Sequence, residues 1–105
     1  MTENAYQAKL TKKIKRMFPG CVLLKNDAAY QQGILDWTIL YEDKWASLEV
    51  KASADAVLQA NQEFFVHKLN DMSFAAVIYP ENEAEVLGAL QQAFAIQGRT
   101  CVLES

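Results

Sequence analysis

The amino-acid sequence predicts an α/β fold in which a mixed β-sheet carries helices on both faces. Segments with helical apolar spacing alternate with short β-branched and aromatic segments, in the order αβββαβα. The chain has 105 residues, 51% of them apolar, and no run of about 18 apolar residues that would cross a membrane. We therefore expect a single domain over residues 1–105, with one core and no membrane contact.

The first helix is expected at residues 3–18. Thr2 is a candidate N-cap, and Pro19 followed by Gly20 is a typical stop signal. The apolar stripe of this helix consists of Tyr6, Leu10, Ile14 and Met17. A second face, with spacing i, i+3, i+4 and i+7, is basic and consists of Lys9, Lys12, Lys13 and Arg16.

Three strands are expected after this helix. A short apolar run covers residues 21–25, and a polar loop over residues 26–33 leads into a hairpin. The hairpin strands are residues 36–41 and 45–52, joined by a three-residue turn at 42–44.

The second half of the chain is expected to supply two helices and a buried strand. Residues 59–72 form a helix whose inward face carries Gln62, Phe65, Leu69 and Met72. Residues 74–79 are a strand, and residues 81–96 are a third helix that begins with acids suited to its dipole. A last edge strand is expected at residues 100–103.

The net charge of −3 conceals a strong asymmetry. Residues 1–26 hold six basic residues against Glu3, a net charge of +5, whereas the rest of the chain is acidic. Because a partner responds to the local field, the overall charge does not exclude nucleic acid. The basic helix face is either an ordinary solvated surface or a contact surface for phosphates.

The two cysteines, Cys21 and Cys101, are too few for a disulfide framework or a zinc cluster. We expect both to be buried free thiols, which indicates a reducing, cytoplasmic location. The first residues lack a basic start followed by an apolar stretch, so no secretion signal is expected.

Three reactive side chains are expected to meet at one end of the hairpin. Strand alternation places Glu49 and Lys51 on one face, about 7 Å apart along the strand. The hairpin brings Asp36 opposite residues 49–51. Two carboxylates about 4 Å apart repel by roughly 4 kcal/mol at an effective dielectric constant of about 20, and a cation such as Mg²⁺ removes that repulsion. The alternative is a surface Glu/Lys pair beside an acid that merely begins a strand.

Two further polar residues extend the apolar stripes of the predicted helices. Glu3 lies within about 20° of Leu10 on a helical wheel, and Gln62 continues the stripe of the second helix. Each is either a contributor to the same sheet end or an ordinary residue at a helix start. Gln7 shares the face of Glu3 and is an alternative to it.

The motif Gly33-Ile34-Leu35-Asp36, followed by Leu48-Glu49-Val50-Lys51 and a helix with Gln62, resembles the PD-(D/E)XK nuclease superfamily. Within it, the sequence is similar to the small VRR-NUC and Holliday-junction-resolvase-like phage nucleases, over residues 3–79. The resemblance implies a restriction-endonuclease-like core and a metal-dependent DNA endonuclease that selects DNA by structure, with little sequence specificity. The pattern departs from the family at Leu35, where proline is frequent.

The resemblance also implies roles for individual residues. The ligands of Mg²⁺ or Mn²⁺ would be Asp36, Glu49, the backbone carbonyl of Val50, and Glu3. Lys51 would orient water and phosphate, and Gln62 would steady the site. The expected DNA contacts are Lys9, Lys12, Lys13, Arg16 and Lys25, and the expected assembly is a homodimer.

Two other interpretations stay open. One is a catalytically inactive nuclease-fold module that binds nucleic acid or a protein partner. The other is an unrelated α/β domain that binds a protein through its acidic C-terminal half.

Overall fold

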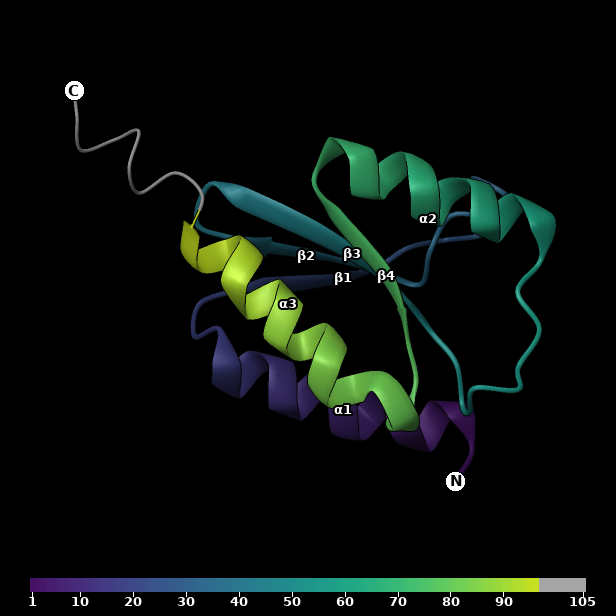
Figure 1. Ribbon diagram of the computed structural model, residues 1–105, viewed down its shortest axis with the longest axis horizontal. Helices are drawn as coiled ribbons and strands as arrows, with labels where there is room; N and C mark the ends of the chain where they lie inside the picture. The colour runs from purple at the N-terminus through teal and green to yellow at the C-terminus, as the bar shows by residue number, and fades with distance from the viewer. Residues whose placement is uncertain (97–105) are drawn as a thin grey trace.

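The computed structural model describes residues 1–96, in which three helices surround a four-stranded sheet (Figure 1). The helices are α1 (Glu3–Met17), α2 (Ala60–Met72) and α3 (Glu83–Ile96), with a 3₁₀ turn (Pro80–Asn82) before α3. The strands are β1 (Val22–Lys25), β2 (Trp37–Tyr41), β3 (Lys44–Val50) and β4 (Phe74–Ile78). The predicted mixed α/β fold and its element order are confirmed. The strand expected at residues 100–103 and the thiol of Cys101 lie outside the described residues.

The sheet is mixed, with the strand order β1-β2-β3-β4. Neighbouring strands are antiparallel from β1 to β3, and β4 joins β3 in parallel. A parallel pair needs a crossover connection, which α2 provides. The carboxyl ends of β3 and β4 and the start of β2 therefore lie at the same end of the sheet.

The core lies between the sheet and the helix pair α1 and α3, which cover one face while α2 covers the other (Figure 1). The fully buried members of this core are Leu10, Ile14, Trp37, Ile39, Ala46, Leu48, Val50, Ile78 and Leu90. Phe18 follows α1 and is 3% exposed, so it completes a stripe that was expected to end at Met17. Cys21 is only partly buried, which corrects the expectation of a fully buried thiol. In the part of the chain that the structure describes, no helix is long and apolar enough to cross a membrane.

The outer layer formed by α2 is less buried than its sequence pattern predicts. No residue of Ala60–Met72 is fully buried, and Met72 is 62% exposed. The helix packs on β3 and β4, but the side chains that it places there are at most partly buried. The expectation that Met72 faces inward is therefore wrong.

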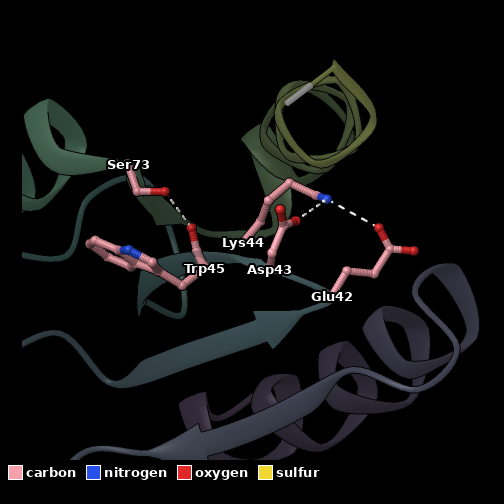
Figure 2. A network of polar contacts seen from close by, with 5 residues as sticks. All are labelled: Glu42, Asp43, Lys44, Trp45 and Ser73. Carbon is pink, nitrogen blue, oxygen red and sulfur yellow. Dashed lines mark hydrogen bonds and ion pairs between the residues drawn. The ribbon is translucent and has the colours of Figure 1, made fainter. Parts of the chain in front are cut away.

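The turn between β2 and β3 is one residue shorter than predicted. Tyr41 pairs with Lys44, so the turn consists of Glu42, with a φ of 59°, and Asp43. Lys44 therefore begins β3 and is 7% exposed, with its ammonium 3.1 Å from Glu42 and 2.9 Å from Asp43 (Figure 2). These two ion pairs balance the charge of a lysine side chain that is only 4% exposed.

Figure 2 also shows how the end of α2 is joined to β3. The hydroxyl of Ser73, the C-cap residue directly after α2, donates a hydrogen bond of 2.6 Å to the carbonyl of Trp45. This bond holds the crossover helix in place between the two parallel strands.

Candidate active site

The hairpin places two carboxylates side by side at the end of the sheet. Trp37 pairs with Leu48, so Asp36 and Glu49 occupy the next opposed positions. The backbone N–H of Asp36 donates to Glu49 Oε1 at 3.2 Å, and the N–H of Val50 donates to Asp36 Oδ2 at 2.8 Å. Each carboxylate is therefore fixed by a backbone donor from the opposite side of the hairpin.

Two more side chains converge on Glu49. The Gln62 amide donates to Glu49 Oε2 at 2.8 Å, and Lys51 Nζ lies 3.3 Å from the same oxygen. Gln62 is itself held, because its Oε1 accepts a hydrogen bond of 2.9 Å from the N–H of Gln59 at the start of α2. The N–H of Lys51 donates to the carbonyl of Ile78 at 2.9 Å, which anchors the lysine backbone to β4. The structure thus brings together four of the predicted site residues.

The Glu49 carboxylate lies in a buried environment that disfavours its charge. Its side chain is 3% exposed, whereas that of Lys51 is 15% exposed. Burial raises the pKa of Glu49, the neighbouring Asp36 carboxylate raises it further, and Lys51 only partly offsets these two effects. One lysine therefore leaves the carboxylate pair with excess negative charge.

The donor chemistry of this pair fits Mg²⁺ or Mn²⁺. Asp36 and Glu49 offer hard carboxylate oxygens, and Val50 is held against Asp36 through its N–H. Among residues 1–96, no group of three or more His, Cys, Asp and Glu side chains lies close enough to hold a metal ion. Two carboxylates are nevertheless sufficient for Mg²⁺, which usually keeps several waters and shares its coordination shell with substrate phosphates.

Glu3 is not brought into this group. It is exposed in the first turn of α1, where the Thr2 hydroxyl accepts a hydrogen bond of 3.1 Å from the N–H of Ala5 and caps the helix. Gln7, one turn later on the same face, is 9% exposed. Glu3 thus has the surroundings of an acid that stabilises a helix N-terminus, and the structure gives no support to a role as metal ligand.

Asn26 positions Asp36, although the sequence indicated only a loop residue there. Its N–H donates to the carbonyl of Asp36 at 2.8 Å, and its Nδ2 donates to the carbonyl of Leu35 at 2.8 Å. Its Oδ1 accepts a hydrogen bond of 3.1 Å from the hydroxyl of Thr38. These three bonds hold the backbone on both sides of Asp36. In the sequence, their only sign was an asparagine directly after the strand that pairs with β2.

Gly33 positions the second helix against the motif loop. Its φ is +87°, and a Cβ at this position would lie 2.8 Å from Cβ of Asn61. The loop that leads to Asp36 therefore packs directly on the first turn of α2, next to Gln62. A glycine three residues before an aspartate was the only sequence sign of this close approach.

The basic residues predicted to contact DNA are divided between two hollows. Lys9, Lys12, Lys13 and Arg16 line a hollow of about 240 Å³, which Glu83 of α3 also lines. Glu83 pairs with Lys13 and accepts a hydrogen bond of 2.9 Å from the hydroxyl of Tyr6. Lys25 lies elsewhere, with Lys15, in a hollow of about 470 Å³ between α1 and β1. The helix face has the predicted grouping, but Lys25 does not continue it.

Comparison of the chain with models of protein families, with curated proteins and with solved structures gives no match.

Proposed function

We propose that the protein is a metal-dependent nuclease that hydrolyses phosphodiester bonds in DNA, with a restriction-endonuclease-like core and a preference for DNA structure over sequence. The observation that carries the proposal is the convergence of Asp36, Glu49 and Lys51 at one end of the sheet, with Gln62 fixing Glu49. A carboxylate pair with one buried member has unbalanced negative charge unless a cation joins it. The similarity of the motif residues to the PD-(D/E)XK pattern supports the same function.

Each residue of the site has a distinct role in this proposal. Asp36 and Glu49, with the carbonyl of Val50, hold the cation. Bound Mg²⁺ supplies a Lewis acid for the phosphate and lowers the pKa of a coordinated water. Lys51 donates to a non-bridging oxygen of the scissile phosphate as negative charge accumulates there. The water oxygen would bond to phosphorus while the bond from phosphorus to the leaving sugar oxygen breaks. The attacking water would release one proton to solvent, and the leaving oxygen would take one up to become an alcohol.

The test is cleavage of supercoiled plasmid and of a labelled panel comprising duplex, nicked, flap and four-way-junction DNA. We expect cleavage with Mg²⁺ or Mn²⁺, none with EDTA, and a preference within the panel for branched DNA. Lys51→Ala should reduce the cleavage rate by about 100-fold or more, because a donor to the developing charge is lost. Lys68→Ala, at an exposed lysine of α2, is the matched control and should cleave normally.

Two outcomes would contradict this proposal. If the wild-type protein binds DNA but cuts no substrate in either metal, the fold serves as a binding module and not as an enzyme. If Lys51→Ala cleaves as fast as Lys68→Ala, the protein is a nuclease whose site lies elsewhere.

The basic hollow of α1 is expected to contribute to the salt dependence of DNA binding. Lys12 and Arg16 are exposed and take part in none of the ion pairs found in residues 1–96, whereas Lys13 is neutralised by Glu83. Lys12→Glu combined with Arg16→Glu should weaken binding and reduce the slope of log K against log salt by about 2. An unchanged slope, measured beside Lys68→Glu, would identify this face as an ordinary solvated surface.

A further inference from the structure

A second hollow, on the α1 face of the sheet, has the chemistry of an anion site. We call it the α1–β1 hollow. It has a volume of about 470 Å³, and its walls include Gln7 and Lys15 of α1, Lys25 of β1 and Trp37 of β2. No carboxylate is among the described residues that line it. The only formal charges in its walls are therefore positive.

Trp37 brings an unsatisfied hydrogen-bond donor to this hollow. The residue is 1% exposed, and its indole N–H is the one buried side-chain polar group of residues 1–96 without a hydrogen-bond partner. Buried donors in folded proteins are nearly always paired, so this unpaired one is available to an acceptor oxygen that a ligand brings. The indole nitrogen is covered in the free protein, so a ligand oxygen reaches it only after the side chains around it move.

The two lysines of the hollow are free to receive an anion. Lys15 and Lys25 are both exposed, and neither forms an ion pair within the described part of the chain. The other basic hollow differs in this respect, because Glu83 neutralises Lys13 there. Two free ammonium groups, an amide and an indole N–H form a donor set suited to an anion with several oxygens, such as a phosphate.

The hollow lies at the same end of the sheet as the carboxylate pair. Lys25 pairs directly with Trp37 across β1 and β2, and Trp37 follows Asp36 in the chain. Asn26, the residue after Lys25, donates to the carbonyl of Asp36. Side chains alternate along β2, so Trp37 and the hollow lie on the α1 face of the sheet end whose other face carries the carboxylate pair. A nucleic acid strand that passes round the β1 edge can therefore contact both.

We propose that the α1–β1 hollow binds a backbone phosphate of the substrate strand, outside the phosphate that is cleaved, through Lys15, Lys25, Gln7 and the indole N–H of Trp37. The identity of the strand as substrate rests on the proposed nuclease function. The presence of a phosphate site in the hollow rests only on the contacts described above.

The experiment follows the two indole N–H signals of the full chain by ¹H–¹⁵N NMR in EDTA, which prevents cleavage. Trp45 supplies an internal control, because it is a half-buried tryptophan whose carbonyl is bonded to Ser73 on the α2 side of β3. Trp37→Phe and Trp45→Phe assign the signals. Titration with a short oligonucleotide should shift the Trp37 signal and leave that of Trp45 unchanged. Titration with inorganic phosphate should produce the same shift at higher concentration.

A second measurement does not depend on the folding of a tryptophan variant. Lys15→Gln combined with Lys25→Gln should reduce the slope of log K against log salt for the oligonucleotide by about 2, whereas Lys68→Gln should leave it unchanged.

Trp37→Phe, where it folds, should weaken oligonucleotide binding by about 10-fold or more, because a hydrogen bond to a charged oxygen is lost.

The outcomes separate this proposal from the proposed function. A static Trp37 signal with an unchanged salt slope overturns the phosphate site, even if the protein cleaves DNA. A shift with inorganic phosphate but not with the oligonucleotide identifies a site for free anions and overturns the assignment to the strand. A shift with both ligands in a protein that never cleaves supports the phosphate site and removes the nuclease function.

Discussion

Glu49→Gln is expected to weaken cation binding and DNA cleavage strongly while leaving the metal-free protein folded. Glutamine keeps the shape of the side chain and an oxygen that accepts from the N–H of Asp36. Its amide nitrogen replaces the oxygen that accepts from Gln62 and pairs with Lys51, so these contacts are lost. The substitution removes the negative charge that burial and Asp36 disfavour. Cleavage should fall by about 100-fold or more, since one of the two cation-binding carboxylates is lost.

The pH dependence of stability gives this prediction a definite sign. Because the pKa of Glu49 is raised on folding, the folded state binds more protons than the unfolded state between the ordinary and the raised pKa. The stability due to this group is therefore complete below the ordinary glutamate pKa of about 4.3, and it is lost as the pH rises through the raised pKa. Thermal unfolding in EDTA should show the wild type losing stability relative to Glu49→Gln over this range.

Addition of Mg²⁺ should reverse this difference in the wild type alone. A cation present at ten times its Kd stabilises the folded state by about 1.4 kcal/mol, or roughly 6–11 °C in Tm for a domain of this size. Glu85→Gln, at an exposed acid of α3, is the matched control and should respond to Mg²⁺ like the wild type. An equal rise in Tm for Glu49→Gln would show that the cation binds elsewhere.

The hairpin shows which parts of the site the sequence alone was able to predict. Strand alternation correctly put Glu49 on the face opposite Leu48 and Val50, because side-chain direction follows from backbone geometry. The predicted three-residue turn would have opposed Asp36 to residue 50. The observed two-residue turn opposes it to Glu49, so the two carboxylates share a face. The two-residue turn contains Glu42 at a φ of 59°, a conformation that a glutamate in the sequence does not signal.

The first helix shows the limit of a periodic pattern. Periodicity correctly predicted the buried stripe of Tyr6, Leu10 and Ile14, and it assigned Glu3 to the same direction. The direction in which a helical side chain points does not tell whether another element lies opposite it. No element within residues 1–96 covers Glu3, which is exposed. Gln62 was identified from the same kind of pattern, but its bond to Glu49 depends on the crossover that sets α2 on β3. A contact between elements that are distant in the sequence depends on the tertiary structure, so the residue spacing along one helix does not predict it.

The substitution Gly33→Ala is expected to destabilise the protein and to disturb the site through α2. The residue has a φ of +87°, where a Cβ costs about 1–2 kcal/mol. That Cβ would also lie 2.8 Å from Asn61 Cβ and 3.0 Å from its backbone carbonyl carbon. Overpacking of this kind adds about 1–3 kcal/mol, so the free energy of unfolding should fall by roughly 2–5 kcal/mol, as measured by urea denaturation.

Gly20→Ala is the matched control, because it separates backbone strain from steric overlap. Gly20 has nearly the same φ, +89°, but no atom lies within 4 Å of the position of its Cβ. Its substitution should therefore cost only the conformational strain, about 1–2 kcal/mol, and should leave cleavage normal wherever the protein is folded. Gly33→Ala should in addition lose cleavage at temperatures where it is still folded, because Asn61 is displaced and the next residue, Gln62, holds Glu49. Equal losses of stability and unchanged cleavage in both variants would show that the loop and α2 adjust without moving Gln62, and that the close approach at Gly33 does not position the site.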